Sequence, residues 1–186
     1  DELDTLERLG LEANGYALLT LHRPSNVDDS ATLSALFEAL EEIHRKLPIV
    51  FPVHPRTSGA IRDLLGGKQP ALKILPPQGY LEFLRLMSQS AFVLTDSGGI
   101  QEETTALGVP CLTLRDNTER PITIEEGTNL LIGSRADDVR NAALRILDGD
   151  AKRGRVPKLW DGHTAGRIAD ILERDLWPGV ETRGPV

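Results

Sequence analysis

The 186 residues include 21 basic and 28 acidic side chains, giving a formal net charge of −7, and 40% of the residues are hydrophobic. This composition is typical of a globular domain of ordinary size, and it argues against a disordered chain, a membrane span or a general nucleic-acid-binding surface. The single cysteine, Cys111, excludes an intrachain disulfide and a cysteine-based metal site. No signal peptide opens the sequence, so we expect a cytoplasmic compartment.

The first residues differ in character from the rest of the chain. Residues 1–15 mix acidic side chains with Leu3, Leu6 and Leu9, which is typical of a linker or of the end of a helix from a preceding domain. We therefore expect an N-terminal domain to be missing from this sequence. The folded domain is predicted over residues 16–175, with a tail over residues 176–186.

Apolar runs alternate with amphipathic segments along the chain. The expected strands are residues 16–21, 49–53, 72–75, 91–94, 109–114 and 128–132. The expected helices are residues 30–46, a short helix ending at 65, and residues 80–88, 100–107, 119–126, 134–147 and 161–172. Because the strands are apolar on consecutive residues, the pattern predicts a parallel sheet with helices on both faces, a Rossmann-like three-layer α/β sandwich.

Polar residues in front of three helices predict their N-caps. Asp28 or Asp29 precedes the helix from residue 30, Thr57 or Ser58 precedes the short helix, and Thr118 precedes the helix over residues 119–126. Apolar periodicity in the helices at 80–88 and 161–172 predicts inward-facing side chains. These are Leu81, Leu84, Met87, Ile168, Ile171 and Leu172.

Polar residues also follow the strands, where each strand ends. They are His22, His54, Gln78, Ser97 and residues 115–120. In a parallel α/β sheet, ligands bind in the crevice beyond the carboxyl ends of the strands. The sequence therefore predicts a ligand site at this edge of the sheet.

A glycine-rich turn, Leu-Thr-Asp-Ser-Gly-Gly-Ile-Gln-Glu-Glu over residues 94–103, joins a strand to a helix. The first amides of a helix have no partner within it, and the helix dipole adds positive charge, so a phosphate is favoured there. Ser97 can cap the helix or bind a ligand oxygen, and Gly98 and Gly99 let a diphosphate approach the backbone. The alternative interpretation is a structural serine cap followed by first-turn acids.

Residues 94–127, with Asp-Asn-Thr-Glu-Arg-Pro at 116–121, resemble the C-terminal half of the non-hydrolysing UDP-N-acetylglucosamine 2-epimerases. The resemblance extends from Leu18 to about Leu172. It implies one half of a two-domain GT-B-type architecture, and the interconversion of UDP-N-acetylglucosamine and UDP-N-acetylmannosamine by elimination and re-addition of UDP. This places the protein in nucleotide-sugar metabolism for polysaccharide biosynthesis, with no metal or redox cofactor.

The resemblance also implies how the activity is divided between the two halves. The acid and base groups that act on the sugar belong to the N-terminal domain. We therefore expect this chain alone to bind UDP or a UDP-N-acetylhexosamine weakly and not to epimerise it. The full-length family forms homodimers, and no nucleic acid or membrane partner is implied.

The resemblance assigns the phosphate and ribose contacts. It places His22 at the substrate diphosphate as a catalytic residue; without it, a loop histidine is more often structural. Ser97, Gly98 and Gly99 would bind the diphosphate. Glu103 would accept hydrogen bonds from the ribose hydroxyls, or would merely complement the helix dipole. Arg120 would lie close to the ligand; its alternative role is a surface salt bridge with Glu119 or Asp116.

The uracil and an activator are assigned in the same way. Gln78 and Phe83 match positions that hold uracil, although Phe83 is as readily explained as a core residue of its helix. Arg23 and His54 match residues that bind a second, activating UDP-N-acetylglucosamine in several members. Two departures weaken the match: Pro24 stands where many members have a second arginine, and residues 55–57 differ from the regulated members.

Two other functions fit the same motifs. One is the hydrolysing relative of these epimerases, which releases UDP and free N-acetylmannosamine. The other is a module that only binds UDP-sugars, or the donor domain of a glycosyltransferase.

Overall fold

The computed structural model describes residues 5–66 and 70–176. In this part of the chain, a parallel sheet is formed by β1 (Ala17–Thr20), β2 (Ile49–Pro52), β3 (Lys73–Leu75), β4 (Phe92–Thr95), β5 (Cys111–Thr113) and β6 (Asn129–Leu131). The strand order is β3-β2-β1-β4-β5-β6. The predicted parallel α/β sandwich is confirmed.

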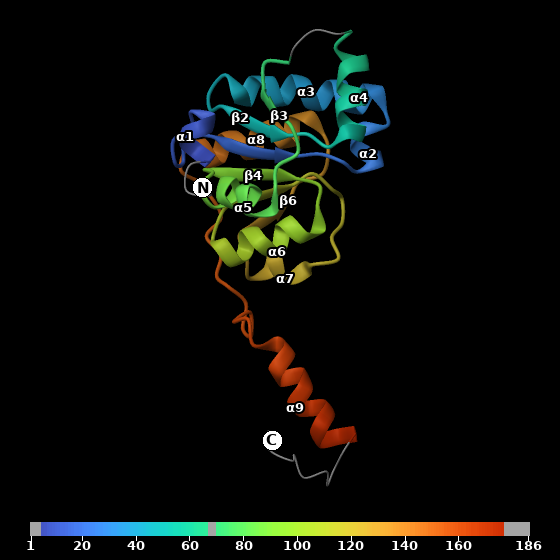
Figure 1. The fold of residues 1–186 in the computed structure, drawn as a ribbon. Coiled ribbons are helices and arrows are strands. Elements are labelled where there is room, and N and C mark those ends of the chain that lie inside the picture. Colours follow the sequence, from blue (N-terminus) through green and yellow to red (C-terminus); the bar gives the residue numbers. More distant parts are fainter. Residues whose placement is uncertain (1–4, 67–69, 177–186) are drawn as a thin grey trace.

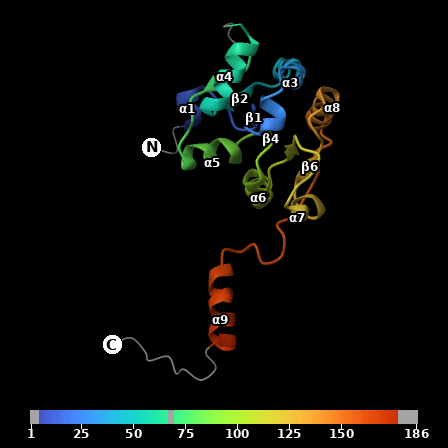
Figure 2. The same cartoon turned by 90° about the vertical axis from the view of Figure 1, so that its right-hand side faces the viewer.

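Helices cover both faces of the sheet (Figures 1 and 2). One layer contains α2 (Pro24–Val27), α3 (Ser30–His44), α4 (Pro55–Leu64) and α8 (Ala136–Leu147). The other contains α1 (Thr5–Leu9), α5 (Tyr80–Ser88) and α6 (Gly98–Leu107), with α7 (Pro121–Glu125) beside α6 and β6. Alternate residues of each strand serve the two layers: Ala17 and Leu19 face the α3 layer, and Leu18 faces α5. Because both faces are buried, most residues of the strands are apolar, and β1, β4 and β5 each end in a threonine.

The strands are added on one side of β1 first and then on the other side, so the strand order reverses between β1 and β4. It runs outward from β1 through β2 to β3 and then returns to place β4 beside β1. The loops that follow β1 and β4 therefore meet at the topological switch point, where α/β sheets bind ligands. Thr20 and Thr95 are paired in register at the ends of these strands, and their hydroxyl oxygens are 2.6 Å apart.

Three of the described helices have proline as their first residue, and two of them were predicted to begin after a threonine or serine cap. The predicted cap at Asp29 is confirmed, because its carboxylate accepts a hydrogen bond from the Thr32 amide at 2.8 Å. The other cap predictions are wrong. α4 begins at Pro55, so Thr57 lies inside it, buried, and donates to the Leu21 carbonyl at 2.8 Å. Similarly, α2 and α7 begin at Pro24 and Pro121, since proline has no N–H to leave unpaired in the first turn.

Two predicted inward faces are exposed. Met87 is buried and Leu84 is half-buried as predicted, but Leu81 is 51% exposed. α9 (Thr164–Leu176) extends away from the sheet in both views (Figures 1 and 2), and no residue along it is buried. The expected contacts of Ile168, Ile171 and Leu172 are therefore absent from the described part of the chain, because no described element faces that side of the helix.

The segment between α8 and α9 packs closely against the sheet domain at two glycines. Gly154 lies against the backbone of Gly127, and Gly127 lies against the side chain of Thr105 in α6. A Cβ atom at either glycine would overlap its neighbour, so both positions require glycine. The Arg155 amide donates to the Glu126 carbonyl at 2.8 Å. The chain is therefore fixed beside β6 before it continues to α9.

The core makes a prediction about stability. Leu36→Ala removes a fully buried side chain from α3, and we expect a loss of about 3 kcal/mol in the free energy of unfolding. Leu172→Ala is the matched control, because Leu172 is 46% exposed on α9, and it should change stability by less than about 0.5 kcal/mol. Urea unfolding measures both. Equal losses for the two variants would contradict the burial described here.

Candidate functional site

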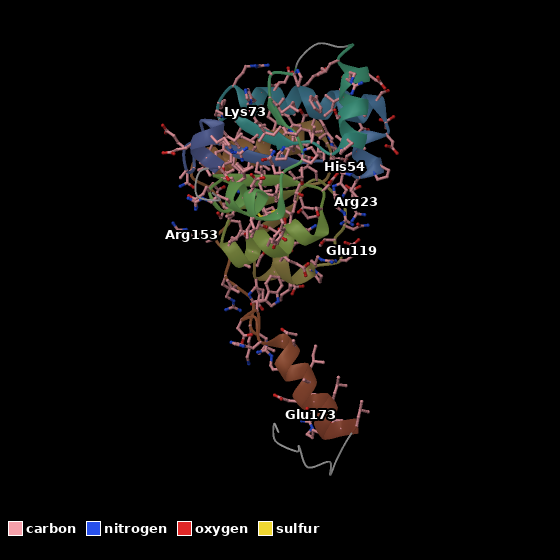
Figure 3. The ribbon with its side chains drawn as sticks, in the orientation of Figure 1. Arg23, His54, Lys73, Glu119, Arg153 and Glu173 are labelled. Carbon is pink, nitrogen blue, oxygen red and sulfur yellow. The ribbon has the colours of Figure 1, made fainter. Side chains whose placement is uncertain are left out.

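The site lies at the carboxyl edge of the sheet, around the switch point. Figure 3 shows Arg23, His54 and Glu119 at this edge of the domain and Lys73 at the opposite edge. His22 and Arg23 follow β1, Asp96 and Ser97 follow β4, and residues 115–120 follow β5. The predicted gathering of polar residues beyond the strand ends is present.

The carboxylate of Asp96 joins the loops after three strands. It is fully buried, and Oδ2 accepts hydrogen bonds from the backbone amides of His22 (2.9 Å) and Arg23 (2.8 Å) and from Asn26 Nδ2 (3.2 Å). Oδ1 lies 2.8 Å from His22 Nδ1. Asn26 also donates to the carbonyl of Leu114, at the end of β5, at 3.1 Å. A buried carboxylate needs such donors, and here they set the positions of the surrounding loops.

The sequence interpretation assigned no role to Asp96. Its signal was an acidic residue directly after a buried strand. Such a residue needs donors from its neighbours, but the sequence does not say which loop provides them. His22 directly follows the β1 end as predicted, and its side chain is 47% exposed at the rim, with the ring against Asp96.

The glycine-rich turn lies at the same edge of the sheet, where the Ser97 hydroxyl and the first amides of α6 have no partner within the helix. Ser97 is the N-cap residue of α6, yet its hydroxyl makes no capping hydrogen bond. Its amide donates to Thr95 Oγ1 at 3.0 Å, and its carbonyl accepts from Gln101 Nε2 at 3.2 Å. The serine is therefore held through its backbone. α6 starts at Gly98, two residues earlier than predicted, so the amides of both glycines belong to its first turn.

Arg120 lies over the glycine-rich turn. A Cβ atom at Gly98 would lie 3.5 Å from the Arg120 Cζ atom, whereas one at Gly99 would meet nothing within 4 Å. The guanidinium donates from Nε to Glu102 at 2.9 Å, and its Nη1 is 3.9 Å from Glu119. The salt bridge to Glu102 was not predicted. A guanidinium and a helix N-terminus thus flank the same space, which favours an anion.

A buried amide network holds the Arg120 loop against α6. Gln101 is fully buried, and its Oε1 accepts hydrogen bonds from Thr118 Oγ1 (2.6 Å) and Asn129 Nδ2 (3.2 Å). Asn129 Oδ1 accepts from Thr113 Oγ1 at 2.6 Å. Thr118, predicted as a helix cap, instead accepts from the Arg120 amide at 3.0 Å. These hydrogen bonds connect β5, β6 and α6 beneath the site. They also fix the position of the Arg120 backbone, from which the guanidinium extends.

A second ion pair shapes the same loop. Arg115 donates two hydrogen bonds to the carboxylate of Glu119, at 2.7 and 3.0 Å, and one to Asn117 at 3.1 Å. Its hydrogen bonds to Glu119 raise the pKa of Arg115. The same bonds lower the pKa of Glu119 to about 2. This bidentate pair orders residues 115–120 at the rim.

The remaining predicted residues lie on α5 and α6 and in the loops after β2 and β3. Glu103 is half-buried on α6; burial raises the pKa of its carboxyl, a hydrogen bond from Tyr80 lowers it, and the charge of Glu102 raises it. Gln78 donates from Nε2 to the Pro76 carbonyl at 2.7 Å in the β3–α5 loop. Phe83 is partly buried on α5, packed against the core, and α5 contacts α6. His54 is exposed after β2, the strand beside β1.

Acidic side chains of the site are paired with basic ones, as Glu119 is with Arg115, and those that the structure describes are not gathered around a metal position. Among the described residues, no three His, Cys, Asp or Glu side chains are grouped as a metal site would require. The same part of the chain contains no helix with both the length and the apolar content of a transmembrane span.

Comparison with known proteins finds relatives over nearly the whole chain. The family model described as UDP-N-acetylglucosamine 2-epimerase matches residues 2–173. The UDP-N-acetylglucosamine 2-epimerase of Methanocaldococcus jannaschii is 42% identical over 165 residues, which cover 84% of this chain and 44% of that protein. The UDP-2,3-diacetamido-2,3-dideoxy-D-glucuronate 2-epimerase of Pseudomonas aeruginosa is 39% identical, covering 87% and 45%.

A solved structure gives the same result in three dimensions. The crystal structure of the M. jannaschii enzyme in complex with UDP-N-acetylglucosamine and UDP has a TM-score of 0.74 and 37% identity, covering 93% of this chain and 52% of that one. The likeness confirms the predicted Rossmann-like half of a GT-B-type architecture. This chain spans about half the length of the relatives it matches.

The Arg115–Glu119 pair makes a pH prediction. Because the folded-state pKa of Glu119 is lowered to about 2, the pair contributes stability above the ordinary glutamate pKa of 4.5 and loses it as the pH falls toward 2. We expect Glu119→Gln to lower the urea midpoint at pH 6, and the difference from wild type to shrink steadily toward pH 2. In an Arg115→Gln background, Glu119→Gln should have no such effect. A difference that grows on acidification would contradict the assigned pair.

Proposed function

We propose, from the premise that this chain belongs to the UDP-N-acetylglucosamine 2-epimerase family, that it is the UDP-binding half of an enzyme interconverting UDP-N-acetylglucosamine and UDP-N-acetylmannosamine. The observation that carries the proposal is the first turn of α6, which begins at Gly98 and Gly99 and has the Arg120 guanidinium beside Gly98. The match to an enzyme solved with UDP-N-acetylglucosamine and UDP supports it.

The diphosphate would bind between α6 and the loop after β1. On one side, phosphate oxygens would accept hydrogen bonds from the amides of Gly98 and Gly99 and from the Ser97 hydroxyl, which makes no capping hydrogen bond. Arg120 adds a charge above the same turn, and His22 closes the space from β1. Two negative phosphates need this local positive field, because the chain as a whole carries a net charge of −7.

The nucleoside would extend across α5 and α6. Glu103 is proposed to accept hydrogen bonds from the ribose hydroxyls. Gln78 and the edge of Phe83 would contact the uracil, which needs one flat apolar surface and a few directed hydrogen bonds. Arg23 and His54, at the ends of neighbouring strands, are proposed to hold a second UDP-N-acetylglucosamine as an activator.

The reaction would use this half to hold UDP while the sugar changes. As the bond between the sugar and the β-phosphate breaks, its electron pair goes to a phosphate oxygen, and the α6 amides, Arg120 and His22 stabilise that charge. UDP remains bound to them until it adds back to the 2-acetamidoglucal. The groups that remove and return the C2 proton belong to the other half of the enzyme. Retaining UDP favours epimerisation over hydrolysis, and product analysis of the full-length protein separates the two outcomes.

A second substrate is favoured by one relative. The P. aeruginosa protein is named for a diacetamido-glucuronate linked to UDP. Every contact proposed between this chain and the substrate itself is made to UDP, so a different 2-acetamido sugar would be accommodated by the other half without changing the substrate site described above. Testing both nucleotide sugars with the full-length enzyme distinguishes the two functions.

The phosphate contact is tested by a glycine substitution. Gly99→Ala adds a methyl group where the protein has free space, so stability should not fall, but the methyl group would meet a phosphate bound on the helix. We expect UDP affinity to fall about tenfold or more by calorimetry. Gly166→Ala in α9 also adds a methyl group in free space, and it should leave UDP affinity unchanged. Equal affinities for all three proteins would refute the proposed position of the diphosphate.

The division of labour between the two halves is tested with the chain itself. Incubated with UDP-N-acetylglucosamine, the 186-residue protein should bind it and release neither UDP-N-acetylmannosamine nor free UDP. The physical reason is that the proposed site holds UDP but provides no base for the C2 proton. Anion-exchange chromatography of the mixture detects both products. Measurable turnover would show that this half contains the catalytic acid and base.

A further inference from the structure

We propose that Asp96 is a positioning residue that fixes the tautomer of His22, so that the ring exchanges protons only at Nε2, on the side of the diphosphate. This inference deepens the proposed function and rests on it for the identity of the anion. The contact between Asp96 and His22 is independent of that function.

The tautomer follows from the atoms in contact. Oδ1 of Asp96 lies 2.8 Å from Nδ1 of His22, and an ionised carboxylate can only accept a hydrogen bond. Nδ1 must therefore hold a hydrogen. In the neutral ring the lone pair then lies on Nε2, and in the charged ring the second N–H is at Nε2. The side chain is 47% exposed, so Nε2 is the nitrogen left to reach a ligand.

The carboxylate cannot rotate to accommodate the other tautomer. Its second oxygen accepts from the amides of His22 and Arg23 and from Asn26 Nδ2. A half-turn only exchanges two equivalent acceptor oxygens, and any smaller turn would leave these donors without partners beside a fully buried carboxylate, which is costly. The histidine is therefore held twice by the same residue, through its backbone amide and through its ring.

Asp96 also links the histidine to the anion site, because it is hydrogen-bonded to His22 and is joined to Ser97 by a peptide bond. It directly precedes Ser97, whose amide is bonded to Thr95 at 3.0 Å, and Gly98 begins α6. The position of the ring is thus set relative to the helix amides by one short, rigid stretch of backbone. A proton given from Nε2 to the departing phosphate oxygen leaves a neutral ring, and the same nitrogen takes the proton back when that oxygen attacks the sugar.

The tautomer is measured by 15N–1H NMR of the histidine rings at a pH where they are neutral. We expect His22 as the Nδ1–H form. His44 is the internal reference, because its Nδ1 accepts a hydrogen bond from the Ile49 amide at 2.9 Å, which requires the opposite Nε2–H form. A wild-type spectrum with His22 in the Nε2–H form would overturn the proposal without any substitution.

Asp96→Asn separates positioning from packing. The amide keeps the size of the carboxylate and one acceptor oxygen for the backbone amides, but it turns an N–H group toward Nδ1 of His22. We expect His22 to switch to the Nε2–H form while His44 stays unchanged. Retention of the Nδ1–H form in the folded variant would show that Asp96 does not set the tautomer.

A double-mutant cycle links the tautomer to the ligand. Asp96→Asn should weaken UDP binding about tenfold, the effect of one hydrogen bond to a charged group, and should have little further effect in a His22→Gln background. An equal loss in both backgrounds would mean that Asp96 acts only through folding, which overturns its positioning role. Absence of UDP binding to the wild type would refute the proposed function, and the tautomer measurement would still decide the role of Asp96.

Discussion

The buried carboxylate of Asp96 is the constraint on which the site depends. A charge without solvent must be surrounded by donors, and here the donors come from the segment after β1, while the carboxylate itself follows the neighbouring strand β4. Asn26 extends the same network to the carbonyl of Leu114 at the end of β5. β1 and β4 are adjacent although β2 and β3 lie between them in the sequence, so the strand order brings the carboxylate and its donors together.

Much of the fold follows from the sequence, because apolar runs and helical periodicity depend only on neighbouring residues. The parallel sheet, the Asp29 cap and the collection of polar residues at one edge were predicted in this way. The role of Asp96 was not, since it requires the strand order, which no local pattern encodes. The same limit applies to Arg120, whose partner Glu102 lies 18 residues away. For α9, periodicity shows that one face is apolar but not what covers that face.

The charges at the site are arranged as competing pairs. Arg120 contacts Glu102 and lies over Gly98, so an anion on α6 has to compete with that carboxylate for the guanidinium. The proposed diphosphate would bring more charge than a single carboxylate, and it would also accept hydrogen bonds from the first amides of α6. Arg115 is engaged bidentately by Glu119 and is less free to respond. The proposed diphosphate would therefore have to displace Glu102 from Arg120 in order to bind.

The stacked glycines beside β6 have a mechanical consequence. Gly154, at the base of the segment leading to α9, touches Gly127, and Gly127 touches Thr105 on the helix that carries the glycine-rich turn. The route of the chain past β6 is therefore set by close packing at two positions that have no side chain. Any residue other than glycine at either position would have to displace the segment that leads to α9 or the contacts around Thr105.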